Sequence, residues 1–285
     1  ALEDPTSCPG GRDFLAGRNA TQTACAAKRK PPIKPGSGFA GDVGTLNRNA
    51  ASINMALLYG ARLCKHELLR PIQRLAEALH KWTPLHSRKL HRLIEYTARH
   101  LDDCQYGFIG DEWKDLRLRY YSDADLASDK SDYKSTSGGL LVLVRPKSFF
   151  PICSVCRKQG AVSPSTPEAE TVALFDGLKN EVIPMLTLWD FILDCKVVVQ
   201  AFEDNETCIK ILLSGKFDKA LGHVGRVHGI DLAWLKLILD ACLFTIHDCH
   251  TCSMCADIFT KYFVYADNWS HATALIPVLP HVNSK

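Results

Sequence analysis

The sequence predicts an α/β domain with a mixed five-stranded sheet, preceded by a helical appendage. Two observations lead to this fold class. Apolar residues recur at helical spacing over residues 50–101, but after Leu116 they alternate with polar residues or form short runs. The later elements follow the order βββαβαβα, which places helices on the faces of a mixed sheet.

Three helices are expected in the appendage, which spans residues 50–110. Pro71 falls in the first turn of the second helix, where its missing N–H does no harm, and Pro84 separates the second helix from the third. The third helix carries a basic face made of Arg88, Lys89, Arg92 and Arg99. Such a face either follows a phosphate backbone or is simply solvated, and both interpretations stay open.

The domain that follows, residues 116–265, is expected to open with three antiparallel strands. Its strands are predicted at 116–121, 139–144, 149–155, 197–202 and 243–247. Its helices are predicted at 168–193 with a break near Pro184, and at 205–213, 229–239 and 256–263.

The two ends of the chain are expected to lie outside these elements. Residues 1–45 are rich in Pro, Gly, Ser and Thr and predict a disordered or linker-like leader, while residues 266–285 are expected to form a tail. The leader contains a basic run at 28–32. We interpret this run as a solvated linker, with a nuclear-import signal or a nucleic-acid contact as the alternative.

Composition limits the class of protein. The chain of 285 residues is 46% hydrophobic and 23% charged, which is typical of soluble globular proteins. It lacks a run of roughly 18 apolar residues, and Leu2 is followed at once by Glu3 and Asp4. We therefore expect an intracellular protein, cytoplasmic or nuclear, with no membrane partner. The 12 Cys are then expected to be reduced thiols.

Charge is distributed unevenly along the chain. Residues 1–120 carry 19 Lys and Arg against 12 Asp and Glu, a balance of +7, whereas residues 121–285 carry 15 against 19, a balance of −4. A basic half that grips a polyanion and an acidic half that holds cations would produce this asymmetry. Two domains that merely differ in surface charge would produce it as well.

Four acidic residues occupy the boundaries of predicted elements. Asp123 lies just past a strand, Glu170 falls near the start of a helix, Asp204 follows the buried strand 197–202, and Asp257 opens the last helix. Enzymes that use two metal ions need carboxylates that converge from distant parts of the chain in this way. Each residue alone is better explained as a helix cap or first-turn acid, so the pattern of four is what indicates a metal site.

These acids lie in six short motifs, which are YSDADLASD (121–129), KSTSG (134–138), STPEAET (165–171), EDN (203–205), HGID (228–231) and ADIFTK (256–261). In order and spacing they resemble the motifs of the ribonuclease H domain that ends copia-type LTR retrotransposon polyproteins. Residues 57–59 and 85–96 resemble, more weakly, the stretch that joins the polymerase to ribonuclease H in the same polyproteins.

The resemblance implies a ribonuclease H-like fold and hydrolysis of the RNA strand of an RNA–DNA hybrid. It implies that two Mg²⁺ ions, or Mn²⁺ in their place, are held by the catalytic carboxylates Asp123, Glu170, Asp204 and Asp257. Asp125 and Glu168 are then expected to be supporting or capping groups. The implied partners are the hybrid and other polyprotein regions, and the oligomeric state stays open.

The chain also departs from the family pattern. Leu126 replaces an aromatic residue, Thr171 a Tyr and Glu203 a Cys, and Gly229 is inserted in the fifth motif. Glu203 adds a negative charge beside Asp204, which would repel substrate phosphate or simply point outward. The polymerase signature Tyr-x-Asp-Asp is absent from the sequence, so we expect no polymerase site. The chain is thus expected to be a fragment or remnant, with an inactive nucleic-acid-binding remnant as the alternative.

Cysteine and histidine offer competing sites. Cys153 and Cys156 form one Cys-x-x-Cys pair and Cys252 and Cys255 another, which raises the alternative of a tetrahedral zinc site. Among the histidines, His250 precedes Asp257 and His228 lies in the fifth motif. Both are candidate auxiliary groups for proton transfer or product release.

Overall fold

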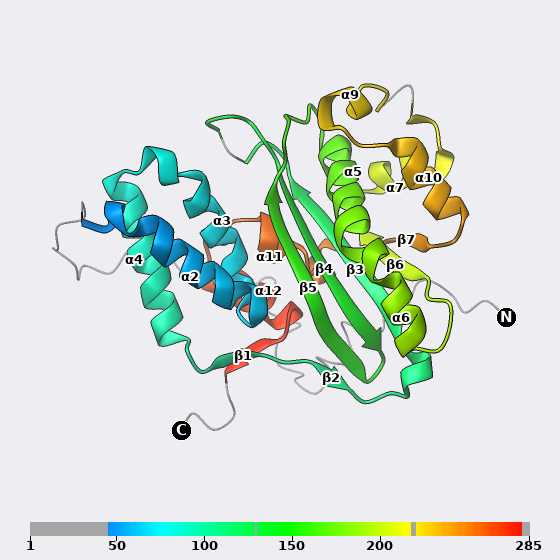
Figure 1. The fold of residues 1–285 in the computed structure, drawn as a ribbon, viewed down its shortest axis with the longest axis horizontal. Helices are drawn as coiled ribbons and strands as arrows, with labels where there is room; N and C mark the ends of the chain where they lie inside the picture. The colour runs from blue at the N-terminus through cyan, green and yellow to red at the C-terminus, as the bar shows by residue number, and fades with distance from the viewer. Residues whose placement is uncertain (1–44, 129, 218–220, 281–285) are drawn as a thin grey trace. The chain divides into compact units, whose positions relative to one another are not determined.

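A computed structural model describes residues 45–128, 130–217 and 221–280 of the chain (Figure 1). These residues form two compact units, described separately below. The sheet unit comprises residues 107–260, and the helical unit comprises residues 45–106 together with 261–280. The predicted leader, apart from its last residue, lies outside the described residues, and so does its basic run.

The sheet unit is built on a mixed sheet whose six described strands follow the order β2-β5-β4-β3-β6-β7. Neighbours from β2 to β3 pair antiparallel, whereas β3-β6 and β6-β7 pair parallel. The strands are β2 (Phe108–Ile109), β3 (Arg117–Asp125), β4 (Thr136–Arg145), β5 (Ser148–Lys158), β6 (Val199–Glu203) and β7 (Phe244–Asp248). The predicted α/β class is confirmed. The predicted count of five strands is wrong, because a two-residue strand adds to β5 without any alternation to reveal it.

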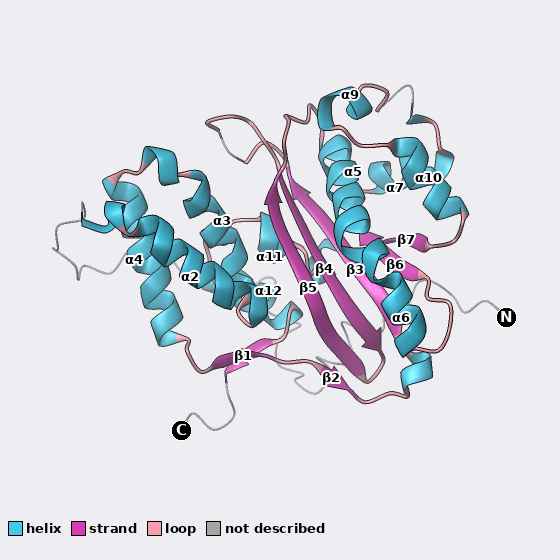
Figure 2. Cartoon of the chain, in the orientation of Figure 1, coloured by secondary structure: helices cyan, strands magenta, loops and turns pink. Residues whose placement is uncertain are grey.

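One face of the sheet is covered by α5 (Thr166–Gly177), which packs on β3 and β4 (Figure 2). Tyr120 of β3 is buried between them, and its hydroxyl lies where a Cβ on Gly139 or Gly177 would be. Two residues without side chains therefore let a large aromatic residue fill the contact between helix and sheet.

The remaining helices of the sheet unit follow the predicted sequence with local differences. The helical run after α5 passes through a π turn (Leu178–Val182) and a 3₁₀ turn (Ile183–Met185) around Pro184, which confirms the predicted break. The other helices are α6 (Leu186–Ile192), α7 (Glu206–Ser214), α9 (Val224–His228), α10 (Leu232–Asp240) and α11 (Asp257–Thr260), with 3₁₀ turns at Trp113–Asp115 and Thr251–Ser253. The predicted closing helix 256–263 is thus shorter than expected.

The opposite face of the sheet receives α11. Gly138 and Gly139 are neighbours in β4, so their missing side chains would point to opposite faces. A Cβ on Gly139 would meet Tyr120 below α5, whereas a Cβ on Gly138 would lie 2.6 Å from Thr260 Cγ2 in α11. The two glycines therefore assign α5 and α11 to opposite faces of the sheet.

The helical unit contains the three predicted helices, α2 (Ala50–Leu63), α3 (Leu69–Glu77) and α4 (Pro84–Arg99). Its 3₁₀ turns are Thr45–Arg48, His66–Leu68 and Leu79–Lys81. The Asn54 side chain donates to Ile72 O (3.2 Å), which joins α2 to α3 inside the unit. None of the described helices combines the length and the apolar character that crossing a bilayer requires.

Residues after the sheet unit return to the helical unit. They form α12 (Ala266–Leu275) and β8 (Val278–Pro280), and β8 pairs antiparallel with β1 (Asp103–Gln105). Trp269 Nε1 donates to Tyr96 Oη (3.2 Å) and thereby joins α12 to α4. The described part of the expected tail is therefore a packed helix and strand.

Candidate metal centre

Asp123 lies inside β3, where it is opposite Gly138 of β4. The sequence predicts that Asp123 lies just past the end of this strand. Pairing with β4 extends the strand to Asp125, so Asp123 lies within it. The Asp123 side chain is on the α11 face and only 2% of the residue is exposed. Gly138 leaves room for α11, whose Thr260 hydroxyl donates a hydrogen bond to Asp123 Oδ2.

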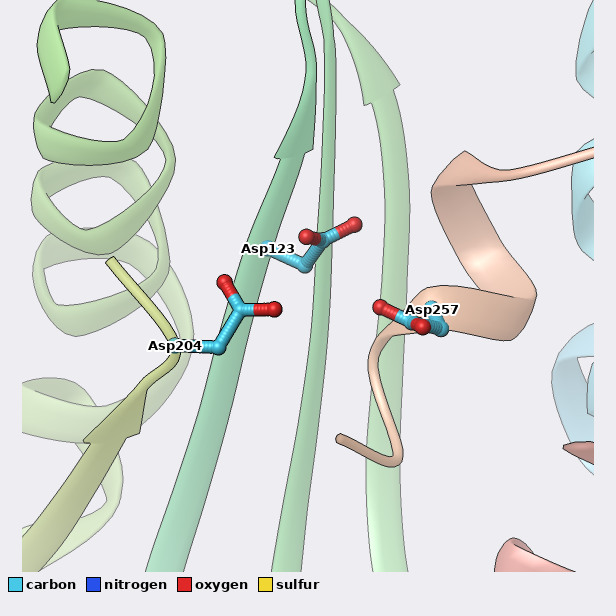
Figure 3. A group of neighbouring side chains, drawn as sticks. All are labelled: Asp123, Asp204 and Asp257. Atoms are coloured by element: carbon cyan, nitrogen blue, oxygen red, sulfur yellow. The ribbon is translucent and has the colours of Figure 1, made fainter. Parts of the chain in front are cut away.

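Asp204 and Asp257 approach Asp123 from two other elements. Asp204 is the first residue after β6, and Asp257 is the first residue of α11. One carboxylate oxygen from each of the three residues lies within 4.8 Å of the others (Figure 3). Three acids that are distant in the sequence therefore form one group at the end of the parallel strands.

A second group of carboxylates shares Asp204. Glu170 of α5, Glu203 at the end of β6 and Asp204 each contribute an oxygen within 4.8 Å of the others. Glu170 is 2% exposed and Glu203 is 0% exposed. The four acids picked out by the sequence thus meet through Asp204, and a fifth acid, Glu203, joins them.

Strand alternation explains why there are two groups. Phe202 of β6 stacks on Tyr121 of β3 with ring centroids 5.2 Å apart, and Tyr121 shares its face of the sheet with Asp123. Glu203 follows Phe202, so it points to the other face, where α5 supplies Glu170. Asp204 lies just past the strand and takes part in both groups.

Burial dominates the electrostatics of Glu203. It raises the pKa of this carboxyl well above the ordinary value, and the charges of Asp123 and Asp204 raise it further. Cys208 on α7 is buried as well, and its burial raises the pKa of its thiol. The negative charges of Glu203 and Glu170 raise this pKa further by smaller amounts. Of the two alternatives left open for Glu203, an outward orientation is contradicted, because its position on the strand directs the side chain into the interior.

Two threonines that the sequence did not single out contact these carboxylates. Besides Thr260, which bonds Asp123, Thr251 donates from its hydroxyl to Asp204 Oδ2 (3.1 Å). Both contacts join segments far apart in the chain, so no local signal reveals them. Thr260 lies in the ADIFTK motif, three residues after Asp257, and this motif is the sequence signal that indicates it.

Glu168 belongs to neither group. It is buried, and its two oxygens face His223 Nε2 (2.8 Å) and His228 Nε2 (3.0 Å). Ser163 Oγ lies 3.3 Å from the same nitrogen of His228. Asp125, at the end of β3, is half-buried and also lies outside both groups.

The two candidate auxiliary histidines have different surroundings. The His228 side chain is 2% exposed and is engaged with Glu168. His250 is exposed, and its Nδ1 accepts from the Cys252 backbone N–H (3.2 Å) at the start of a 3₁₀ turn. Of the two, only His250 retains a ring edge open to solvent, one residue before Thr251.

The zinc alternative gains no support from the described residues. Within them, the groups of His, Cys, Asp and Glu close enough to hold one ion contain carboxylates alone. Cys156 donates to Phe259 O (3.1 Å), and burial raises the pKa of Cys153 to about 12. A buried thiol with a raised pKa is a poor source of the thiolate that zinc requires.

The basic face predicted on α4 is solvent-exposed within the helical unit. Its members Arg88, Lys89, Arg92 and Arg99 are all exposed. Arg99 NH2 lies 3.9 Å from Glu95 Oε2, one turn earlier in the helix. The placement suits a solvated face and a phosphate-binding face equally.

Comparison with known proteins reveals partial relatives. The chain is 35% identical over 99 residues to the Retrovirus-related Pol polyprotein from transposon RE1 of Arabidopsis thaliana, covering 35% of the chain and 6% of that protein. It is also 35% identical over 104 residues to the corresponding polyprotein from transposon RE2 of the same plant, covering 36% of the chain and 7% of that protein. No family model and no solved structure matches the chain. Over about a third of its length, the chain is therefore similar to a small part of retrotransposon Pol polyproteins.

Proposed function

We propose that the chain is the ribonuclease H region of a copia-type retrotransposon polyprotein, or a remnant of it, and that it hydrolyses the RNA strand of RNA–DNA hybrids. The observation that carries this proposal is the meeting of four motif acids, Asp123, Glu170, Asp204 and Asp257, through the shared residue Asp204. The similarity to Pol polyproteins of transposons supports the retrotransposon origin.

The donor set fits hard divalent cations. Both groups offer only carboxylate oxygens, which are the ligands that Mg²⁺ and Mn²⁺ prefer. In each group, one oxygen from every acid lies within 4.8 Å of the others, so the three acids of a group would together be able to hold one cation. Two groups that share one acid also match the demand of nucleases for a pair of neighbouring ions.

Each side chain would then have a defined task. Asp123 and Asp257 would hold one cation, Glu170 would hold the other, and Asp204 would bind both. Thr260 and Thr251 fix the orientation of Asp123 and Asp204 through their hydrogen bonds. When bound, the cations supply an activated water and neutralise charge on the departing 3′ oxygen.

Substrate selection would rest on the shape of the hybrid and on its 2′-hydroxyl groups, because such duplexes are recognised mainly through the minor groove and backbone. In a longer polyprotein, other regions would deliver the hybrid. Those regions are proposed partners, since the relatives are far longer than the stretches that match.

Cleavage of a labelled hybrid by purified protein tests the proposal, with Mg²⁺ or Mn²⁺ added and with EDTA as the metal-free control. Asp204→Asn removes one charge from both groups and should lower cleavage by about a hundredfold or more, as loss of one transition-state contact does elsewhere. Asp240→Asn is the matched control, because this aspartate is exposed at the end of α10. Full activity of the Asp204→Asn variant would refute the assignment.

A second candidate function is hybrid binding without cleavage. The exposed basic face of α4 favours it, because four cations on one helix can neutralise phosphates whatever the state of the metal centre. It predicts salt-sensitive binding, no cleavage with either cation, and a smaller salt dependence for the double variant Arg88→Glu/Lys89→Glu. Metal-dependent cleavage by the wild-type protein would exclude it.

A further inference from the structure

Glu203 has no role in the four-acid site described above, yet it is the most deeply buried of the acids there. It is 0% exposed and ends β6, a strand paired on both sides by β3 and β7. Its side chain is on the α5 face of the sheet, and one of its oxygens lies within 4.8 Å of oxygens of Glu170 and Asp204.

Neither carboxylate oxygen of Glu203 has a hydrogen-bond partner among the described residues. The backbone N–H groups of Asn205 and Asp204 lower the pKa of Glu203 through weak hydrogen bonding, but neither reaches the geometry of a full hydrogen bond to the carboxylate. No Lys, Arg or His in the described ranges forms an ion pair with it. A carboxylate in such a place is costly unless something positive compensates it.

A second polar group on the same face is also unsatisfied. Ser122 precedes Asp123 in β3, so it points to the α5 side, and its buried hydroxyl has no hydrogen-bond partner among the described residues. Its neighbour Tyr121 is paired with Phe202, which places Ser122 and Glu203 one step further along adjacent strands. Two groups with unsatisfied oxygens, the Glu203 carboxylate and the Ser122 hydroxyl, therefore lie on the α5 side of this strand pair.

We propose that Glu203 is a fifth metal-binding carboxylate, which coordinates a divalent cation together with Glu170 and Asp204. This inference rests on the proposed function, because it assigns a ligand to the second of the two cations. The cation supplies the positive charge that the described surroundings of Glu203 lack. A cation at this place also explains why Glu203 is tolerated where the copia-type family, which the sequence resembles, carries a Cys.

The added ligand has a consequence for which metal is bound. Each carboxylate that coordinates an ion replaces one of its waters, and Mg²⁺ gives up water reluctantly. Mn²⁺ binds the same oxygen ligands more tightly in general. The cation beside Glu203 should therefore be held more strongly when it is Mn²⁺, and the preference should depend on Glu203.

Calorimetric titration of the full chain with Mn²⁺, and separately with Mg²⁺, tests this role without reference to activity. We expect two Mn²⁺ ions in the wild-type protein and a loss of at least about tenfold in affinity for one of them in Glu203→Gln, since even outer-shell groups contribute that much. Glu206→Gln is the matched control, because Glu206 is three residues away but exposed on α7.

Thermal unfolding supplies the second readout. Without metal, Glu203→Gln should unfold at no lower temperature than the wild type, because the carboxyl group it replaces has no hydrogen-bond partner for either oxygen among the described residues. With Mn²⁺, the variant should gain less stability than the wild type. A lower melting temperature without metal, together with unchanged Mn²⁺ affinity, would assign Glu203 a structural role and overturn the proposal. If Glu203→Gln does not fold, Glu203→Asp serves in its place, with the same expected loss of affinity for one ion.

The outcomes separate the two proposals. Wild-type protein that binds neither cation refutes both the proposed function and the role of Glu203. If the wild type binds two Mn²⁺ ions, Asp257→Asn loses one and Glu203→Gln loses none, then only the role of Glu203 fails.

Discussion

Gly138→Ala is the substitution whose effect follows most directly from the packing of α11 on the sheet. A Cβ at this position would lie 2.6 Å from Thr260 Cγ2, 3.1 Å from Ala256 O and 3.1 Å from Phe259 Cβ. Non-bonded carbon atoms rest about 3.5–4.0 Å apart, so the Thr260 methyl group has to retreat by about 1 Å.

Local adjustment cannot absorb this displacement cheaply. Rotating Thr260 breaks the hydrogen bond that its hydroxyl donates to Asp123, and the other two atoms belong to or adjoin the backbone of α11. The helix therefore has to move away from the sheet, at a cost of about 1–3 kcal/mol. The melting temperature should fall by about 2–4 °C for each kcal/mol lost. Because Asp257 begins the same helix, Mn²⁺ affinity should fall too.

Thermal unfolding and Mn²⁺ calorimetry, performed on the same preparations, measure both effects. Gly160→Ala is the control, because a Cβ there meets nothing within 4 Å and its effect on stability should stay within about 0.5 kcal/mol. A Gly138→Ala variant with the melting temperature of the wild type would show that α11 does not pack tightly against β4 at this position. A variant that melts early but binds Mn²⁺ normally would show that the position of α11 does not control the site.

Two further predictions concern buried polar groups. Burial raises the pKa of Glu67, so the folded protein binds its proton more readily than the unfolded chain and loses stability as pH rises past the ordinary glutamate range. Glu67→Gln should therefore melt above the wild type at about pH 8 and approach it at about pH 4, whereas equal differences at both pH values would contradict this reasoning. In the sheet unit, His228→Ala should lower the free energy of unfolding in urea by about 1–3 kcal/mol, because it removes a buried partner of Glu168. His223→Ala should cost less because that side chain is 48% exposed, so an equal or larger loss would disprove the assignment.

The central strands and main helices could be predicted because their patterns are local. The alternation at the start of β3, the short apolar runs of β4 and β5 and the β-branched run of β6 are visible within a few residues. The strands β2 and β8 are too short to show a period, and β8 pairs with a segment much earlier in the chain. Their pairing depends on tertiary contacts, which a local pattern does not contain.

The residues of the candidate site also fall into those that the sequence indicated and those that only the folded structure shows. Motif order indicated which four acids belong together, and the structure brings them together through Asp204. The burial of Glu203 depends on which face of β6 is covered, and period-two alternation after Phe202 could have indicated it. The hydroxyls of Thr251 and Thr260 reach the acids only in the folded chain, so the sequence does not predict these contacts, although the ADIFTK motif contains Thr260.

The pairing of β1 with β8 has a consequence for the order in which the protein is assembled. The helical unit is interrupted in the sequence by the whole sheet unit, and its last strand is made after residue 277. During synthesis from the N-terminus, the sheet unit is thus completed before the helical unit. The helices α2, α3 and α4 are made early, but their packing partners Trp269 and β8 are made last. A nascent chain released before β8 would therefore contain every candidate metal ligand but only part of the helical unit.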